Sequence, residues 1–296
     1  MSNDHLKGTG VALVTPMTNQ KEVDFEGLGK LLEYTHKRGV DYWVVMGTTG
    51  ESATLTSKEK AEILSFVKKN NPHKVPIVYG IGGNNTSDVL KEIKETNLLG
   101  VSAILSVSPY YNKPSQEGIY QHYCAIADES PVPVILYNVP GRTASNITSE
   151  TTLRLAKHKN IIGVKEASGD LFQCIRIAKH KPEDFLLISG DDGLTLPIYS
   201  IGGVGVISVL ANAYPGVFKR MKDAYWNCNF ETAQKEVYKL TEVSPLMYVE
   251  SNPVGVKQAL KILGVCDHYV RLPLIEATDE LANQIEDAMR DAGLLE

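Results

Sequence analysis

A lysine ends a short apolar run in the stretch IIGVKEASGD. Ile161 and Val164 predict a buried strand, whereas Lys165 carries a strongly hydrated ammonium group. At pH 7 an ordinary lysine, with a pKa near 10.4, is neutral only about once in 2,500 molecules. Partial desolvation would lower this pKa to about 7–8, and the neutral amine could then attack a ketone carbon to form a Schiff base. The alternative is a lysine that extends outward to water or pairs with Glu166.

Tyr137 ends the preceding apolar run in the same way. Because side chains alternate along a strand, Ile135 and Tyr137 share one face, as Gly163 and Lys165 do. Neighbouring strands lie about 4.8 Å apart, so the phenol and the amine could approach each other. A phenol can relay protons while a carbinolamine becomes an imine. The alternative is a tyrosine that only packs against the end of the core.

Three loop motifs carry groups that suit a carboxylate ligand. GTTGES (residues 47–52) offers small hydroxyls and backbone N–H groups just before a helix. YNVPGRT (137–143) contains Arg142, which could hold a second carboxylate with two parallel hydrogen bonds. SPYYNKPS (108–115) contains Tyr110 and Tyr111. The alternatives are an ordinary turn, a surface arginine and two loop-anchoring tyrosines.

Other chemistries find little support. The seven histidines are never closer than 22 positions in the sequence, so there is no local zinc-binding pair. Neither a nucleophile elbow nor a phosphate-binding P-loop motif is present. Asp191 and Asp192 in GDDG would repel a phosphate. We interpret them as helix N-caps, with divalent-metal ligation as a minor alternative, and predict no metal site.

The elements that must position these residues are strands alternating with helices. The strands are apolar at successive positions, as expected when helices cover one face and a core fills the other. Between them, Leu28, Leu31, Leu32 and Thr35 follow a helical period, and Thr56 with Glu59 predicts a capping box. The predicted strands are Val11–Val14, Tyr42–Val45, Pro76–Tyr79, Val101–Val107, Pro133–Tyr137, Ile161–Lys165, Phe185–Ser189 and Gly205–Ser208.

Eight strand–helix units predict a closed (β/α)₈ TIM barrel, with a doubly wound open sheet as the alternative. The strand signal stops near Asn229, which predicts a barrel domain over 1–228 and a helical domain over 229–296. Three helices are expected there, over 230–246, 254–263 and 279–292, with Asn252 as an N-cap and Pro253 as the first helical residue. Reactive groups gather at the C-terminal ends of barrel strands, where the motifs above lie.

Composition excludes several classes of protein. The 296 residues carry a net charge of −5, which argues against a nucleic-acid partner. No apolar run approaches the roughly 18 residues of a membrane span, and MSNDHLKGTG lacks the apolar core of a signal peptide. The four cysteines show no C-x-x-C spacing. We therefore expect buried thiols in a reducing cytoplasm and no membrane association.

Together these motifs resemble the dihydrodipicolinate synthase branch of the pyruvate-dependent class I aldolases. The resemblance extends over essentially the whole chain, because GTTGES, PYYNKPSQEG, YNVPGRT, GVKEASGD, ISGDD and ESNPVGVK stand in the family's order and spacing. It implies condensation of pyruvate with L-aspartate 4-semialdehyde to give 4-hydroxy-tetrahydrodipicolinate in lysine and diaminopimelate biosynthesis. The resemblance implies no metal or organic cofactor, because the imine serves as the electron sink.

The resemblance also implies roles for individual residues. Lys165 would form the imine with pyruvate, and Arg142 would bind the carboxylate of the semialdehyde. Tyr111 would reach the site across a dimer interface, which implies at least a homodimer and, by family habit, a dimer of dimers. Tyr137, Thr48 and Tyr111 would form the proton relay. Thr49 would help to hold the pyruvate carboxylate, and the backbone carbonyls of Gly190 and Ile207 would line the site.

Two other functions are considered. N-acetylneuraminate lyase and 2-keto-3-deoxy sugar-acid aldolases share the lysine and the tyrosine, but they typically lack an arginine in the context of Arg142. A non-catalytic pyruvate-binding barrel is disfavoured by the intact pair of Lys165 and Tyr137.

The resemblance places an allosteric lysine site at the dimer interface, near Ser52, Ala53, Asn84, Asp88 and Tyr110. Ser57 and Lys60 stand where lysine-sensitive bacterial enzymes often carry histidines, and Asp88 is one methylene shorter than the usual glutamate. The ammonium group of Lys60 would oppose a cationic effector by about 1 kcal/mol. We therefore predict weak or absent feedback inhibition.

Overall fold

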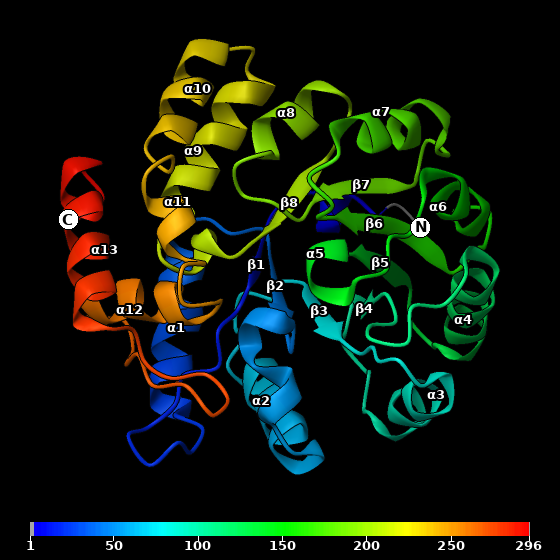
Figure 1. Cartoon of the computed structure of the whole chain (residues 1–296), viewed down its shortest axis with the longest axis horizontal. Coiled ribbons are helices and arrows are strands. Elements are labelled where there is room, and N and C mark those ends of the chain that lie inside the picture. The colour runs from blue at the N-terminus through cyan, green and yellow to red at the C-terminus, as the bar shows by residue number, and fades with distance from the viewer. Residues whose placement is uncertain (1–2, 296) are drawn as a thin grey trace. The chain divides into compact units, whose positions relative to one another are not determined.

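The structure, a computed structural model, describes residues 3–295 (Figure 1). Eight strands follow one another in chain order around one closed barrel, with helices between them. The predicted (β/α)₈ barrel is therefore confirmed, and the open-sheet alternative is wrong. The strands are β1 (Gly8–Ala12), β2 (Tyr42–Val45), β3 (Ile77–Gly80), β4 (Ala103–Val107), β5 (Val134–Asn138), β6 (Ile161–Glu166), β7 (Leu186–Ser189) and β8 (Gly205–Ser208).

The strand bounds differ most from the prediction at β1, which begins at Gly8 and not at Val11. Gly10 lies within this strand, and the position requires glycine because a Cβ there would lie 2.2 Å from the ring of Tyr42 on β2. Glycine has low strand propensity, so the sequence pattern hid this part of the strand. At the other end, the Val14 N–H donates to Asn212 Oδ1.

The chain forms two compact units, Met1–Gly8 with Pro76–Ile207 and Thr9–Val75 with Ser208–Glu296. The predicted domain boundary after residue 228 falls inside the second unit and stays a prediction. Helices of the first unit are η1 (Asp4–Leu6), α3 (Thr86–Glu95), α4 (Gln116–Glu129), α5 (Pro140–Thr143), α6 (Ser149–Leu155), α7 (Leu171–His180) and α8 (Thr195–Ser200). Those of the second are α1 (Phe25–Lys37), η2 (Thr48–Gly50), η3 (Ser52–Thr54), α2 (Ser57–Lys69), η4 (Leu210–Asn212), α9 (Pro215–Trp226), α10 (Phe230–Tyr238), α11 (Val243–Leu246), α12 (Val254–Ile262) and α13 (Asp279–Asp291).

In the first unit, α4, α6 and α7 lie side by side outside the strands (Figure 1). Each begins at a side chain that accepts a hydrogen bond from the first turn: Ser115, Thr148 and Asp170. Such caps stabilise a helix by about 0.5–2 kcal/mol each. The strands between these helices are almost wholly buried. The three capping side chains therefore fix the residues at which α4, α6 and α7 begin.

In the second unit, the predicted capping box of α2 is confirmed. The Glu59 N–H donates to Thr56 Oγ1 at 3.2 Å, and the Thr56 N–H donates to Glu59 Oε2 at 2.8 Å. The helix expected over 230–246 is instead two helices, α10 and α11. Pro245 explains the break, because it lacks an N–H and its ring conflicts with the carbonyl of Thr241 in a continuous helix.

The cysteines are all free, but they are not all buried. Cys174 is buried, Cys124 and Cys266 are half-buried and Cys228, just after α9, is exposed. The prediction of buried thiols is therefore wrong for Cys228. Among residues 3–295, no helix is long and apolar enough to span a bilayer.

Candidate active site

Lys165 and Tyr137 stand side by side at the C-terminal ends of β6 and β5. The register of the two strands pairs them directly, and Lys165 also pairs with Ile188 of β7. The Lys165 Nζ lies 4.2 Å from the centroid of the Tyr137 ring. The two residues are only 5% and 7% exposed, respectively. The structure thus brings an amine and a phenol together in a largely dry site.

An irregularity in β6 sets this pairing. Val134 pairs with Ile161, but the next residue of β5, Ile135, pairs with Gly163. Ile162 is therefore an extra residue in β6. In a regular ladder Tyr137 would lie opposite Val164, whose side chain points to the other face.

Gly190 makes room for the lysine. A Cβ at this position would lie 2.7 Å from the Cβ of Ala167 and 3.1 Å from Lys165 Cε. The Gly190 N–H donates to the carbonyl of Glu166 at 2.7 Å, which holds the start of the loop after β7 against the end of β6. Ile207, the other residue whose backbone carbonyl is predicted to line the site, is fully buried in β8.

Glu166 does not pair with Lys165 in the structure, contrary to the alternative considered from the sequence. Its carboxylate accepts hydrogen bonds from Asn138 Nδ2, Gln173 Nε2 and the Ser168 N–H. Burial raises the pKa of Glu166, whereas the hydrogen bonds from Ser168, Asn138 and Gln173 lower it. Sequence reasoning missed this cluster. A signal for it was that a polar residue directly follows each predicted site residue at the end of an apolar run, Asn138 after Tyr137 and Glu166 after Lys165.

Arg142 and Tyr111 come from neighbouring segments of the first unit. Arg142 is exposed on α5, and the Tyr111 N–H donates to the carbonyl of Thr143 at the end of α5 at 3.4 Å. The Tyr111 side chain is 87% exposed. The loop that carries Tyr111 is thus fixed beside α5, while its phenol extends into solvent.

Thr48 and Thr49 lie in η2 of the second unit, and Thr49 is buried. Asn252 Nδ2 donates to Thr49 Oγ1 at 3.0 Å. Asn252 is therefore not the N-cap of α12, as the sequence had predicted; Pro253 takes that position, without a side-chain cap. The amide of Asn252 instead fixes a hydroxyl of the GTTGES loop.

A buried ion pair fixes the same loop. Lys257 Nζ lies 2.5 Å from Glu51 Oε1 and also donates to the carbonyl of Tyr269. The Arg271 N–H donates to the second oxygen, Glu51 Oε2, at 3.0 Å. Burial lowers the pKa of Lys257, and Glu51 opposes this shift. These contacts give Asn252 and Lys257 of the motif ESNPVGVK a role in fixing the GTTGES loop, whereas the sequence had suggested only a helix start.

The residues of the predicted allosteric site fall in both units. In the first unit, Asn84 Nδ2 donates to the carbonyl of Tyr110 at 3.0 Å, and Asp88 accepts from Asn85 Nδ2 at 2.8 Å. Ser52 and Ala53 form part of η3 in the second unit. The structure therefore brings Asn84 and Tyr110 together, and the site itself stays a prediction.

The acidic pair after β7 does not cap a helix. Asp191 Oδ1 accepts from the Gly193 N–H at 2.9 Å, but the N-cap of α8 is Leu194. Our interpretation of Asp191 and Asp192 as N-caps is thus wrong. Between residues 3 and 295 there is no group of three or more His, Cys, Asp or Glu side chains arranged to hold a metal ion.

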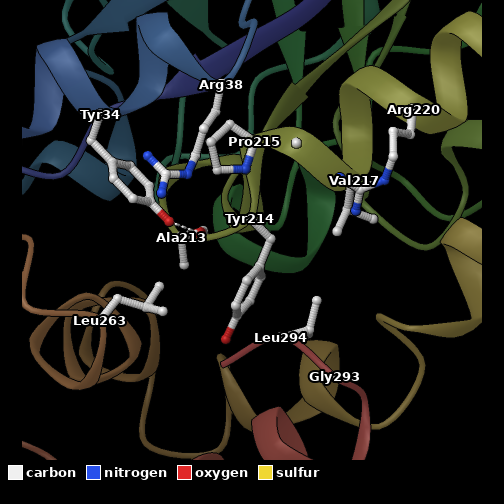
Figure 2. A pocket seen from close by; sticks show the side chains of 11 residues that line it. Tyr34, Arg38, Ala213, Tyr214, Pro215, Val217, Arg220, Leu263, Gly293 and Leu294 are labelled. Atoms are coloured by element: carbon white, nitrogen blue, oxygen red, sulfur yellow. Dashed lines mark hydrogen bonds between the residues drawn. The ribbon is translucent and has the colours of Figure 1, made fainter. Parts of the chain in front are cut away.

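A separate cavity of about 200 Å³ lies in the second unit. Figure 2 shows Tyr34, Arg38, Tyr214 and Leu294 around it. The buried hydroxyl of Tyr214 has no hydrogen-bond partner within residues 3–295. None of the predicted site residues lines this cavity, so it is distinct from the candidate active site.

Comparisons with known proteins agree with this geometry. The model of the Dihydrodipicolinate synthetase family matches residues 5–292. The 4-hydroxy-tetrahydrodipicolinate synthase of Cytophaga hutchinsonii is 52% identical over 281 residues, 95% of each chain. That of Archaeoglobus fulgidus is 42% identical over 289 residues, 98% of this chain and 99% of the relative.

Solved structures give the same result. The dihydrodipicolinate synthase of Thermotoga maritima superposes with a TM-score of 0.94 at 37% identity, over 98% of this chain and 99% of that chain. A structure described as a monomeric dihydrodipicolinate synthase variant gives a TM-score of 0.95 at 37% identity, over 98% of each chain.

The closed barrel, with a buried lysine beside a tyrosine at its strand ends, defines the class: a (β/α)₈ protein with a candidate imine-forming site. Within that class, the chain belongs to the Dihydrodipicolinate synthetase family.

Proposed function

We propose that this chain is a lyase that condenses pyruvate with L-aspartate 4-semialdehyde to give 4-hydroxy-tetrahydrodipicolinate, in lysine and diaminopimelate biosynthesis. The single observation that supports this most directly is the buried pair of Lys165 and Tyr137 in a chain of this family. We place the reaction in the cytoplasm and assign it no metal or organic cofactor.

The reaction begins when Lys165 Nζ attacks C2 of pyruvate. Loss of water gives an imine, which draws electrons from C3, so that C3 loses a proton and becomes an enamine carbon. That carbon attacks the aldehyde carbon of the semialdehyde and forms the new C–C bond, while the aldehyde oxygen takes up a proton to become the product hydroxyl and the imine at C2 forms again. The amino group of the second substrate then replaces Lys165 at C2, which closes the ring and frees the lysine.

The other predicted site residues take the supporting roles in this proposal. Tyr137, Thr48 and Tyr111 carry protons to and from the carbinolamine. Thr49 helps to hold the pyruvate carboxylate, the backbone carbonyls of Gly190 and Ile207 line the site, and Arg142 binds the carboxylate of the semialdehyde.

The exposed phenol of Tyr111 supports a role in a second copy of the chain. We propose a homodimer in which this side chain is covered by its neighbour, assembled further into a dimer of dimers. Because Ser57 and Lys60 replace histidines near the effector residues, we propose that lysine inhibits weakly or not at all; an inhibition constant well below millimolar would contradict this.

Borohydride trapping tests the proposal. Pyruvate and borohydride should add one reduced adduct to the protein, and peptide mapping by mass spectrometry should locate it at Lys165. Lys165→Ala should abolish the adduct, whereas Lys159→Ala, an exposed lysine in the preceding loop, should retain it. A wild-type protein without adduct, or turnover of sialic acid or a keto-deoxy sugar acid but not of the semialdehyde, would overturn the assignment.

A further inference from the structure

Glu166 and Asn138 occupy the rung of the sheet directly after Lys165 and Tyr137. The register pairs Tyr137 with Lys165 and then Asn138 with Glu166. Because side chains alternate, the second pair points to the opposite face of the same two strand ends. Glu166 and Asn138 are 2% and 0% exposed, so this second pair is buried behind the first.

The carboxylate of Glu166 joins three elements. Asn138 Nδ2, from β5, lies 3.0 and 3.1 Å from its two oxygens. The Ser168 N–H, from the loop after β6, donates to Oε1 at 2.8 Å, and Gln173 Nε2, from α7, donates to Oε2 at 2.8 Å. The same group thus ties the end of β5, the end of β6 and the first turn of α7 together.

Every one of these contacts requires an acceptor at position 166. The amide orientation of Gln173 is itself fixed, because Asn146 Nδ2 donates to Gln173 Oε1 at 3.0 Å. The Asn138 amide is fixed likewise, since its Oδ1 accepts from the Ile147 N–H at 2.9 Å. An NH₂ group in place of one Glu166 oxygen would face an N–H donor, and a buried donor without an acceptor is strongly disfavoured.

We propose that Glu166, as a carboxylate, is a positioning residue that keeps Lys165 and Tyr137 aligned by clamping the ends of β6 and β5. The inference rests on the proposed function, because it assumes that Lys165 forms the imine with pyruvate and that Tyr137 relays protons. Alignment matters, since displacement of a reacting group by about 1 Å can cost roughly 100-fold in rate.

Glu166→Gln tests the proposal. We expect kcat to fall by about 10- to 100-fold and the rate of borohydride trapping to fall in parallel, with the KM for pyruvate changed by less than about threefold. Gln173→Glu alone should also be impaired at neutral pH, because two carboxylates would then meet in a buried site, and it should recover as the pH is lowered.

The double variant Glu166→Gln/Gln173→Glu is the sharpest control. It exchanges donor and acceptor across the contact between positions 166 and 173 and should restore kcat to within about threefold of wild type. Melting temperatures of all four proteins report stability separately.

The outcomes distinguish failure of the proposed function from failure of the positioning role of Glu166. A wild-type protein that is never trapped by borohydride defeats the proposed function. A trapped wild type with unchanged kcat in Glu166→Gln, or a double variant no better than the single ones, defeats the positioning role. If Glu166→Gln does not fold, Gln173→Met removes the Gln173 donor to Glu166, together with the acceptor of Asn146 Nδ2. A loss of about three- to tenfold in kcat supports the clamp, and wild-type kcat overturns it.

Discussion

Tyr137 and Lys165 lie opposite each other on β5 and β6 because Ile162 is an extra residue in β6. The insertion moves Lys165 by one position relative to β5, so that its amine lies over the phenol ring at 4.2 Å from the centroid. Bulges are often found next to active sites, where they redirect one side chain. Here the redirected side chain is the proposed nucleophile.

Tyr137→Phe should lower kcat by about 10²- to 10⁴-fold if, as we propose, the phenol relays protons during imine formation. Packing of the ring on the Lys165 amine is kept, so the melting temperature should change little. Steady-state kinetics and circular dichroism check both points. Tyr238→Phe, at an exposed position of α10, is the control. A variant with wild-type kcat would remove Tyr137 from the mechanism.

Gly190→Ala should slow borohydride trapping by about tenfold or more. The new methyl group would meet Ala167 Cβ at 2.7 Å and Lys165 Cε at 3.1 Å, so the lysine must move away from its position beside Tyr137. Gly29→Ala is the control, since its methyl group would meet only the Phe66 ring, at 3.7 Å and beyond. Equal trapping rates in the two variants would show that Lys165 tolerates the displacement.

Asn252→Asp should raise the KM for pyruvate by about 10- to 100-fold with a smaller change in kcat. Because the amide donates to the Thr49 oxygen, the hydroxyl hydrogen stays available for the pyruvate carboxylate that we propose Thr49 to bind. An aspartate would accept that hydrogen instead and would repel the substrate. Asn252→Ala, which only removes the donor, should have a milder effect on KM. The prediction fails if Asn252→Asp binds pyruvate as well as Asn252→Ala does.

His122→Gln should flatten the dependence of stability on pH. Burial lowers the pKa of His122 to about 4, against about 6.5 in an unfolded chain. The unfolded state therefore takes up the proton first as the pH falls. The stability that His122 contributes is present above pH 6.5 and is lost as the pH falls towards 4. Urea titrations at pH 7.5 and pH 5 give the free energy of unfolding. Between these two pH values it should fall on the order of 2 kcal/mol more for wild type than for the variant. Equal decreases in the two proteins would contradict this.

Strand and helix positions could largely be predicted from the sequence, because apolar runs and helical periods are local signals. β2 and β8 have the predicted bounds. The errors have local causes too: Gly10 hid the start of β1, and Pro245 divides the helix expected over 230–246. Asn252 looked like an N-cap because its partner, Thr49, is 203 residues away in the sequence.

The candidate site was predictable only in part. Strand alternation placed Lys165 and Tyr137 on neighbouring strand ends, but the extra residue that aligns them has no sequence signature. The cluster around Glu166 depends on hydrogen bonds between β5, β6 and α7, and no periodic pattern encodes such contacts. Roles for Thr48 and Tyr111 came from the family resemblance alone, and these roles and that of Arg142 stay predictions.

The ion pair between Glu51 and Lys257 joins residues 206 positions apart. During synthesis on the ribosome, Glu51 emerges long before its counter-charge, and a buried carboxylate without a partner is strongly disfavoured. A nascent chain stalled before α12 should therefore exchange the amide hydrogens of Thr48 and Thr49 rapidly, as in an unfolded segment. The loop proposed to hold pyruvate then matures only after α12 has been synthesised, so a chain truncated before α12 would carry the proposed nucleophile but not a finished binding loop.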